Sequence, residues 1–162
     1  MHIHKTLQLH HFKDTSDFTE KELQLIESAR EATYQAFAPY SKFYVGAALL
    51  LSDGSLITGS NQENASFPNG LCAERVALNT FGNAQNDRQI VALAVTARSL
   101  HYKIPRILCP CGGCLQVMAE YVRSCLNIVL LVLYTPKAAI CTNDKVIATQ
   151  QRHYKKPVLV SE

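Results

Sequence analysis

Hydrophobic residues along this 162-residue chain recur with two different periods, which predicts helices alternating with strands. In the first helical segment, Thr19 to Glu22 has the pattern of a capping box, and Pro39 is expected to stop the helix. Its apolar positions are spaced three or four residues apart: Leu23, Ile26, Ala29, Ala32 and Ala36. We expect this helix to serve packing and to carry no chemistry.

A β-hairpin is predicted immediately after this helix. The apolar run Tyr44 to Leu51 reads as a strand, Asp53-Gly54 as the turn, and Leu56 to Gly59 as a second short strand. The segment 60–70 is polar and is expected to form a loop.

The rest of the chain continues to alternate helices with strands. A helix is expected to begin near Cys72 and to end at Gly82-Asn83. The runs Ile90 to Ala97 and Ile128 to Tyr134 are continuously apolar, which is typical of strands buried on both faces in a parallel arrangement. A second helix, Cys111 to Tyr121, lies between them. The pattern predicts an α/β fold.

Length and composition limit the classes of protein that fit. A chain of 162 residues forms one domain with a proper core, and no apolar run approaches the roughly 20 residues that span a bilayer. Met1 to Phe12 lacks a continuous apolar region, so we expect no secretory signal and a soluble, cytoplasmic protein without a membrane partner. A net charge of +3 is too small to imply a polyanion. No nucleic-acid partner is expected, since the chain has neither a basic run nor a tryptophan for stacking.

Six cysteines could in principle form a disulfide framework. We favour a reducing compartment, because the chain is not a small secreted scaffold and three of its cysteines have a metal interpretation. The other three, Cys109, Cys125 and Cys141, are then free thiols.

Three cysteines have the spacing of a zinc site. Cys111 and Cys114 are separated by two glycines, which let the backbone turn tightly enough for both thiolates to reach one ion. Cys72 supplies a third thiolate from far upstream, and no fourth Cys or His stands at matching spacing beside it. Structural zinc sites have four protein ligands, whereas catalytic sites have three and leave a position for water or substrate. The count favours catalysis.

Two charged residues follow Cys72 and extend the metal interpretation. Glu74 is placed to face a zinc-bound water without binding the metal. Thiolates at helix N-termini are stabilised by the dipole, but three of them leave the zinc centre with a net negative charge. Arg75 can hydrogen-bond the ligating sulfurs and offset that charge. The alternative for Arg75 is an ordinary surface arginine.

The order of a Cys or His, one residue, Glu, and later Pro-Cys-x-x-Cys is the signature of zinc deaminases. From about Tyr40 to Tyr134 the chain resembles the small cytidine deaminases that act on free nucleosides. The resemblance implies a three-layer cytidine deaminase-like fold, with a mixed, mostly parallel sheet of about five strands flanked by helices. It also implies one Zn²⁺ per subunit, a homotetramer and a role in pyrimidine salvage.

The same resemblance suggests how the chain is divided. Residues 1–18 are expected to form a flexible N-terminal arm, and 19–135 the catalytic domain. Residues 136–162 would be a divergent C-terminal segment, packed on that domain or extending from it.

The substrate contacts are also implied by the resemblance. Asn61 and Glu63 would hydrogen-bond the ribose 3′-hydroxyl, because together they offer a donor and an acceptor. Phe43 would press on the base, and Ala73 would also contact the substrate. The alternatives are an Asn-rich surface loop at 61–64 and a core aromatic at Phe43.

The implied reaction is hydrolytic deamination of cytidine and deoxycytidine to uridine and deoxyuridine, with ammonia released. Glu74 would take a proton from the attacking water and deliver protons to ring N3 and the departing amine. Two alternatives stay open: a deaminase of another cytosine compound such as blasticidin S, and a zinc-binding interaction module with a decayed active site.

The chain departs from the family pattern at three places. Leu115 stands where the family usually has Arg, and Cys109 where it has Ser or Thr. The family's Phe-containing C-terminal segment is not recognisable after Tyr134, although Tyr154 could substitute for the aromatic. We expect these changes to affect turnover and base stacking more than metal binding.

Overall fold

The computed structural model describes residues 10–11, 18–84, 87–99, 101, 108, 110–124, 129–134, 137–142 and 145–146. Side chains are described for the parts of 18–121 within these ranges. Cys109, Cys125 and Tyr154, to which the sequence assigned roles, lie outside the described residues, as does the side chain of Cys141.

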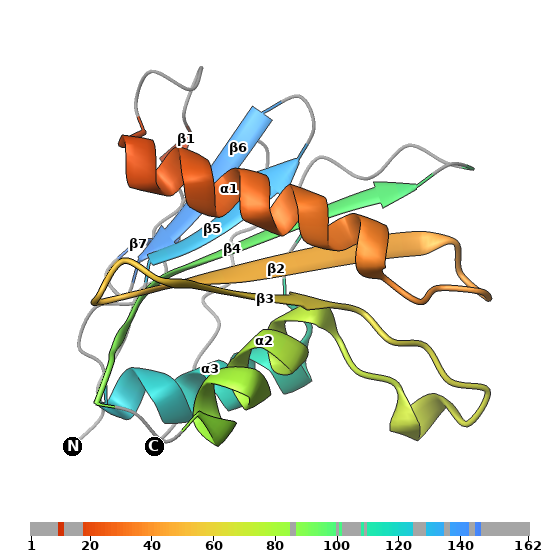
Figure 1. The fold of residues 1–162 in the computed structure, drawn as a ribbon. Helices are drawn as coiled ribbons and strands as arrows, with labels where there is room; N and C mark the ends of the chain where they lie inside the picture. Colours follow the sequence, from red (N-terminus) through yellow and green to blue (C-terminus); the bar gives the residue numbers. More distant parts are fainter. Residues whose placement is uncertain are drawn as a thin grey trace.

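The described elements form three layers, with a sheet between helices (Figure 1). Helix α1 (Glu20–Ala32) covers one face, and helices α2 (Ala73–Asn83) and α3 (Gly112–Ser124) lie side by side on the other. The predicted α/β class and its flanking helices are therefore confirmed. None of the helices in the described part of the chain is both long and apolar enough to cross a membrane.

Within the described residues the sheet has seven strands, in the order β1-β6-β5-β4-β2-β3 with β7 beside β6. Their bounds are β1 (His10–His11), β2 (Phe43–Leu51), β3 (Leu56–Ser60), β4 (Ile90–Ser99), β5 (Val129–Tyr134), β6 (Lys137–Thr142) and β7 (Lys145–Val146). Of the described strand pairs, β4 and β5 are parallel and the others antiparallel.

The expectation of a mostly parallel sheet of about five strands is thus not confirmed. Continuous apolar runs correctly indicated strands covered on both faces, but burial does not determine strand direction. Here an antiparallel hairpin strand is covered on both faces as well. One consequence of the parallel interpretation survives: β3 and β4 point the same way, because each is antiparallel to the β2 strand between them.

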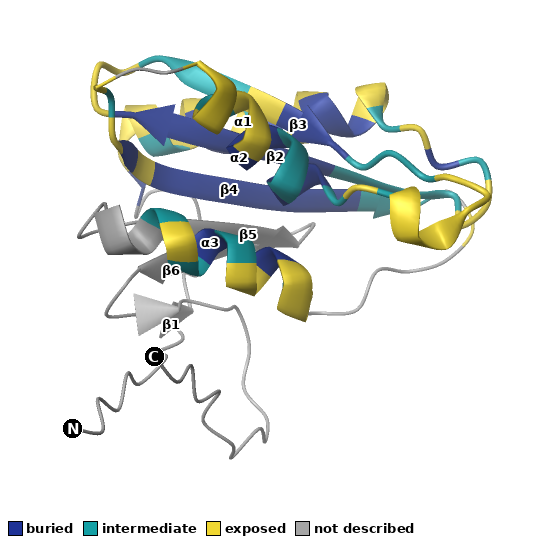
Figure 2. Ribbon diagram, turned by 90° about the horizontal axis from the view of Figure 1, so that it is seen from below, coloured by how far each residue is buried: buried dark blue, intermediate teal, exposed yellow. Residues whose placement is uncertain are grey.

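Alternating side chains of the central strands fill two cores. On β2, Ala47 and Leu49 face α2 and α3, whereas Ala48 and Leu50 face α1. Figure 2 shows buried residues along most of β2 and β4. Gly59 lets β3 approach α2 closely, since a Cβ there would lie 2.5 Å from the Ala73 carbonyl oxygen.

Helix α1 begins as the sequence predicts and ends earlier than expected. Thr19 is its N-cap, and both hydrogen bonds of the capping box with Glu22 are present. The helix ends at Ala32 and is followed by a 3₁₀ turn, η2 (Thr33–Gln35), before Pro39 is reached. Leu25 is fully buried, while Leu23, which the spacing had assigned to the core, is 38% exposed. The other predicted core positions of the helix, Ile26, Ala29 and Ala32, are buried, so the predicted stripe is confirmed apart from its first residue.

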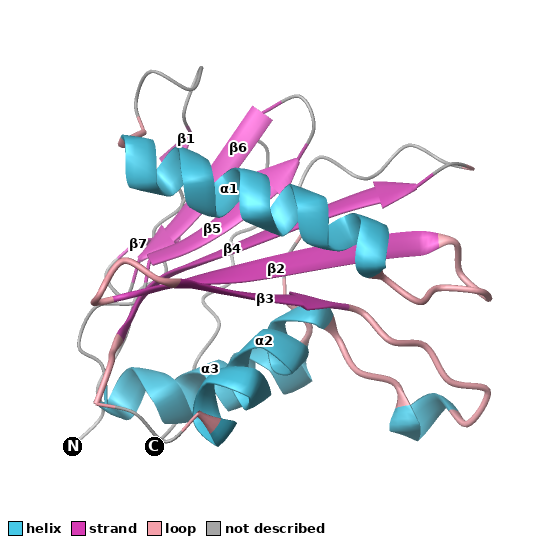
Figure 3. Cartoon of the chain, in the orientation of Figure 1, coloured by secondary structure: helices cyan, strands magenta, loops and turns pink. Residues whose placement is uncertain are grey.

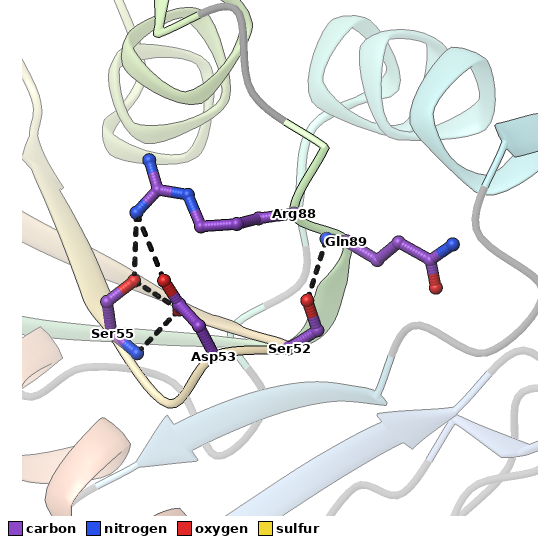
Figure 4. A network of polar contacts seen from close by, with 5 residues as sticks. All are labelled: Ser52, Asp53, Ser55, Arg88 and Gln89. Atoms are coloured by element: carbon purple, nitrogen blue, oxygen red, sulfur yellow. Dashed lines mark hydrogen bonds and ion pairs between the residues drawn. The ribbon is translucent and has the colours of Figure 1, made fainter.

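The end of the sheet at the β2–β3 hairpin is closed by a polar network (Figure 4). The Asp53 carboxylate accepts bonds from the Ser55 hydroxyl at 2.6 Å and its backbone N–H at 2.9 Å. Arg88, just before β4, lies 3.5 Å from the other Asp53 oxygen. Gly54 has a φ of 85°, which suits glycine in the predicted turn. This network ties the hairpin to the start of β4.

Candidate active site

The two halves of the zinc motif lie at strand-to-helix junctions. Cys72 is the N-cap of α2, reached by the loop that leaves β3, and Cys111 directly precedes α3 in the connection from β4. Because β3 and β4 point the same way, both helices begin at the same edge of the sheet. Open α/β sheets usually bind ligands at such an edge.

The three cysteines converge there. The Sγ atoms of Cys72, Cys111 and Cys114 all lie within 4.8 Å of one another. Cys72 Sγ is 3.8 Å from Cys111 Sγ, which is 3.5 Å from Cys114 Sγ. Tetrahedral zinc with Zn–S bonds of about 2.3 Å separates its sulfurs by about 3.8 Å. Both measured separations are near that value, so the cluster fits zinc.

Protonation of the thiols is uneven. The pKa of Cys72 falls to about 5, chiefly because of its hydrogen bond with the Cys114 thiol, with further lowering by Arg75 and Cys111. That bond and burial raise the pKa of Cys114. Cys72 therefore favours the thiolate that binds a cation, and metal binding would displace the proton of Cys114.

Glu74 lies in the first turn of α2, beside the thiols, and is only 5% exposed. Burial raises the pKa of its carboxyl group above the ordinary value, and the negative charge of Cys72 acts in the same direction. Such a carboxyl group can hold a proton as well as release one.

Arg75 extends toward the cluster. Its Nη2 lies 3.7 Å from Cys72 Sγ and donates to the Gly70 carbonyl oxygen at 3.3 Å. The guanidinium therefore contacts the sulfur of Cys72, and this interaction raises the pKa of Arg75. Its Nε is buried and has no hydrogen-bond partner in the described part of the chain.

Asn61 is half-buried at the end of β3 and bonded to the neighbouring strand. Its Oδ1 accepts from the Val45 N–H at 2.7 Å, and its Nδ2 donates to the Phe43 carbonyl oxygen at 2.9 Å. The side chain thus extends the β2–β3 ladder past its last backbone pair. Sequence reasoning missed this second task, because the partners lie 16 and 18 residues away.

Glu63 is similarly tied to the backbone. One carboxylate oxygen accepts from the N–H groups of Tyr40 and Ser41, at 2.9 and 3.2 Å. Partial burial alone would raise its pKa, but these bonds and the Ser41 hydroxyl leave the pKa below its ordinary value. Glu63 is therefore a carboxylate that fixes the turn leading into β2.

The remaining predicted site residues flank the same edge. Phe43 is partly buried at the start of β2 and shares a strand face with Val45, which packs toward α2 and α3. Ala73 is fully buried at the first position of α2. Leu115, in the first turn of α3, is 38% exposed.

Comparison with known proteins agrees with this geometry. Residues 19–129 match the family model described as the cytidine and deoxycytidylate deaminase zinc-binding region. A cytidine deaminase of Halalkalibacterium halodurans is 49% identical over 96 residues, which cover 59% of this chain and 68% of the relative. One from Sporosarcina psychrophila is 44% identical over 100 residues, covering 60% and 68%.

Solved structures give the same result. The crystal structure of cytidine deaminase from Burkholderia pseudomallei matches with a TM-score of 0.64 and 37% identity, over 78% of this chain and 94% of that one. The Mycobacterium tuberculosis enzyme matches with a TM-score of 0.57 and 32% identity, over 75% and 89%. Because the family model covers more than half of the sequence, and its region contains all three clustered cysteines, the chain belongs to the cytidine and deoxycytidylate deaminase zinc-binding family.

Proposed function

We propose that this protein is a zinc-dependent enzyme that hydrolytically deaminates free cytidine and deoxycytidine to uridine and deoxyuridine, releasing ammonia. The observation that carries the proposal is the combination of three thiols at zinc-ligand spacing with a buried carboxyl group beside them. The metal cluster found among the described residues has three members, which suits an open coordination position.

In this proposal Cys72, Cys111 and Cys114 hold the ion. Zinc, when bound, supplies the Lewis acidity that lowers the pKa of a coordinated water. Glu74 moves the protons: it takes one from the water as the oxygen bonds to C4 and delivers it to ring N3. It then takes the second proton of the same oxygen and delivers it to the amine as the C4–N bond breaks. Its burial supports both tasks, because a raised pKa makes the carboxylate a stronger base and leaves more of the carboxyl group protonated, and so able to donate, near neutral pH.

Arg75 offsets charge at the same place. Three thiolates would give the zinc centre a net negative charge and weaken its Lewis acidity. The guanidinium 3.7 Å from Cys72 Sγ withdraws part of that charge from the sulfur, without itself touching the reacting atoms.

The substrate contacts remain those inferred from the sequence. Asn61 and Glu63 are proposed to bind the ribose 3′-hydroxyl, Phe43 to press on the base, and Ala73 to contact the substrate. Their bonds to the β2 backbone and its entry turn support the proposal, because they hold both polar side chains in one orientation before the substrate arrives.

The finer assignments belong to the same proposal. We assign one Zn²⁺ per subunit, a role in pyrimidine salvage, a small-molecule nucleoside as the partner, and a cytoplasmic location. The location is supported by the thiol-built metal centre, which a reducing compartment preserves. We also keep the domain division at residues 18–19 and 135–136.

A homotetramer is the proposed assembly, supported by exposed apolar side chains on the segments next to the site. They are Phe37, Tyr40, Phe67 and Leu71, which are 56%, 63%, 90% and 38% exposed. Phe67 opens the short helix η3 (Phe67–Asn69) in the loop that joins β3 to α2 (Figure 3). Light scattering on a sizing column should give four times the chain mass. Phe67→Ser should lower it, whereas Leu23→Ser, at 38% exposure on α1, should not.

Turnover of the zinc-loaded protein tests the function directly. Cytidine, deoxycytidine and blasticidin S are incubated separately, and ammonia is measured beside bound zinc. We expect ammonia from the two nucleosides. Glu74→Gln should retain zinc and lose activity by about 10²- to 10⁴-fold, the usual contribution of a proton-transfer group.

Each other outcome selects a different conclusion. Ammonia from blasticidin S alone would replace the substrate class within the same chemistry. No ammonia from any of the three, despite bound zinc, would leave the interaction module as the better description. Full activity in Glu74→Gln would remove the carboxyl group from the mechanism.

A further inference from the structure

The zinc centre is assembled from two helices, so its geometry depends on how far one helix is shifted along the other. Cys72 belongs to the start of α2, and Cys111 and Cys114 to the start of α3. The two helices lie side by side beneath the sheet (Figure 1). Apolar packing between helices is non-directional and tolerates sliding, so a directional contact is needed to fix the offset.

Tyr121 of α3 makes such a contact. Its hydroxyl donates to the Leu78 carbonyl oxygen of α2 at 3.1 Å. Its ring meets the Phe81 ring edge-on, with centroids 5.8 Å apart and an interplanar angle of 66°. Tyr121 and Phe81 pack against the same core cluster that contains Cys114. The contact therefore joins the two helices through the core on which the metal site rests.

Gly82 makes room for this hydroxyl. A Cβ at position 82 would lie 2.6 Å from Tyr121 Oη, closer than any stable contact, but 3.7 Å from the ring carbon Cζ. The oxygen atom, and not the ring, would therefore clash with a side chain at position 82. An alanine would force either the hydroxyl or the helix to move, and only while the hydroxyl is present.

The contact also lies at nearly the same distance along each helix from its cysteine. Leu78 is six residues beyond Cys72, a rise of about 9 Å, and Tyr121 is seven residues beyond Cys114, about 10 Å. Two helices that run in the same direction and are joined at these depths have their first turns level. Those first turns are where the cysteines meet.

We propose that Tyr121 is a positioning residue for the zinc centre: its hydroxyl fixes the offset of α3 along α2 and so brings Cys72 to the Cys111–Cys114 pair. The inference rests on the proposed function only in taking zinc as the metal. The hydroxyl is too far along the helix to touch a substrate or the ion, so it acts through the positions of the cysteines.

Metal affinity of the full chain is the appropriate measurement. Tyr121→Phe keeps the ring and removes the oxygen. We expect zinc affinity, measured by competition with a chromogenic chelator, to fall about two- to tenfold, as the loss of one ordinary hydrogen bond implies. The visible spectrum of the Co²⁺-substituted variant should also show a distorted tetrahedral site. A lower Tm with unchanged zinc affinity would overturn the proposal, because it would reduce Tyr121 to general packing.

Gly82→Ala supplies an independent perturbation. With Tyr121 present it should weaken zinc binding more than Tyr121→Phe does, because the Cβ and the hydroxyl cannot both fit. In the Tyr121→Phe background, the same alanine meets only the ring carbon and should cause no further loss. Asn79→Ala, at an exposed position on the same helix, is the matched control and should leave zinc affinity unchanged.

The outcomes distinguish this proposal from the function on which it rests. Equal damage by Gly82→Ala in both backgrounds would overturn the positioning role while leaving the deaminase intact. Failure of the unsubstituted chain to bind zinc at all would overturn both.

Discussion

The two ends of the central strands are built from polar residues in contrasting ways. At the hairpin end, Asp53 and Ser55 bond to each other within the turn, Ser52 bonds to Gln89, and Arg88 lies beside the Asp53 carboxylate in an exposed setting. At the opposite end, Cys72 and Glu74 come from α2 and Cys114 from α3, and Glu74 and Cys114 are buried.

Their charge balance differs as well. The hairpin pairs one carboxylate with one guanidinium. The helix end sets three thiols and a carboxyl group against Arg75, the guanidinium that contacts them. At the hairpin end the charges are balanced within the fold. At the helix end the groups that can carry negative charge outnumber the cation, so this end gains stability when a metal ion binds. The comparison teaches that a functional end is recognised by its unbalanced polar groups rather than by their number.

The strongest test removes a ligand. Cys114→Ser should abolish stoichiometric zinc binding and lower turnover by more than the 10- to 100-fold typical of residues that merely support ligands. Zinc content by atomic absorption and ammonia release measure the two effects. Leu115→Ala, one residue away and partly exposed, is the control and should keep its zinc. Retained zinc in Cys114→Ser would mean that Cys114 is not a ligand, and the proposed contrast between a metal-binding end and a purely structural end would lose its main support.

An intermediate effect on stability and turnover is expected at Asn61. This residue lies at the helix end of the sheet, but both polar atoms of its side chain are hydrogen-bonded, as those of the hairpin residues are. Asn61→Ala removes two strand bonds, each worth about 1 kcal/mol, and should lower Tm as well as raise KM. Asn61→Asp keeps the acceptor for the Val45 N–H and loses the donor to Phe43, so its Tm should lie between those of wild type and Asn61→Ala. An unchanged KM in both variants would make Asn61 structural only.

The smallest effect is expected at the hairpin. Asp53→Asn should leave zinc content and turnover unchanged. Hydrogen bonds from the Ser55 side chain and backbone hold the pKa of Asp53 below 3.8, so its contribution to stability is present above that pH. It is lost as pH falls through the lowered pKa. Thermal melts of wild type and variant should therefore differ slightly near neutrality and converge in acid, and a constant difference would assign the effect to something other than the carboxylate.

Much of the fold was predictable because its signals are local. The capping box at Thr19, the Asp53-Gly54 turn and the start of α2 at Cys72 each depend on residues within a few positions of one another. The clustered cysteines were predictable for the same reason, since each half of the motif is a short run of neighbouring residues. Strand direction was not, because burial on both faces produces the same apolar run in a parallel or an antiparallel strand.

The supporting contacts of the site were also beyond prediction. Asn61 and Glu63 were singled out for a substrate, yet their visible partners are backbone groups of Phe43, Val45 and Tyr40, 16 to 23 residues away. Tyr121 looked like an ordinary apolar position of a helix. Such pairings depend on how the elements assemble, and one sequence contains no local sign of them.

The antiparallel strand β2 has a consequence for the width of the active-site region. By standing between β3 and β4 it separates these two strands by two inter-strand spacings, about 9.6 Å. Packed helices prefer axes 8–10 Å apart. The helices that follow β3 and β4 can therefore lie in one layer with their first turns adjacent. The position of β2 thus sets the distance between the first turns of α2 and α3, where the cysteines cluster.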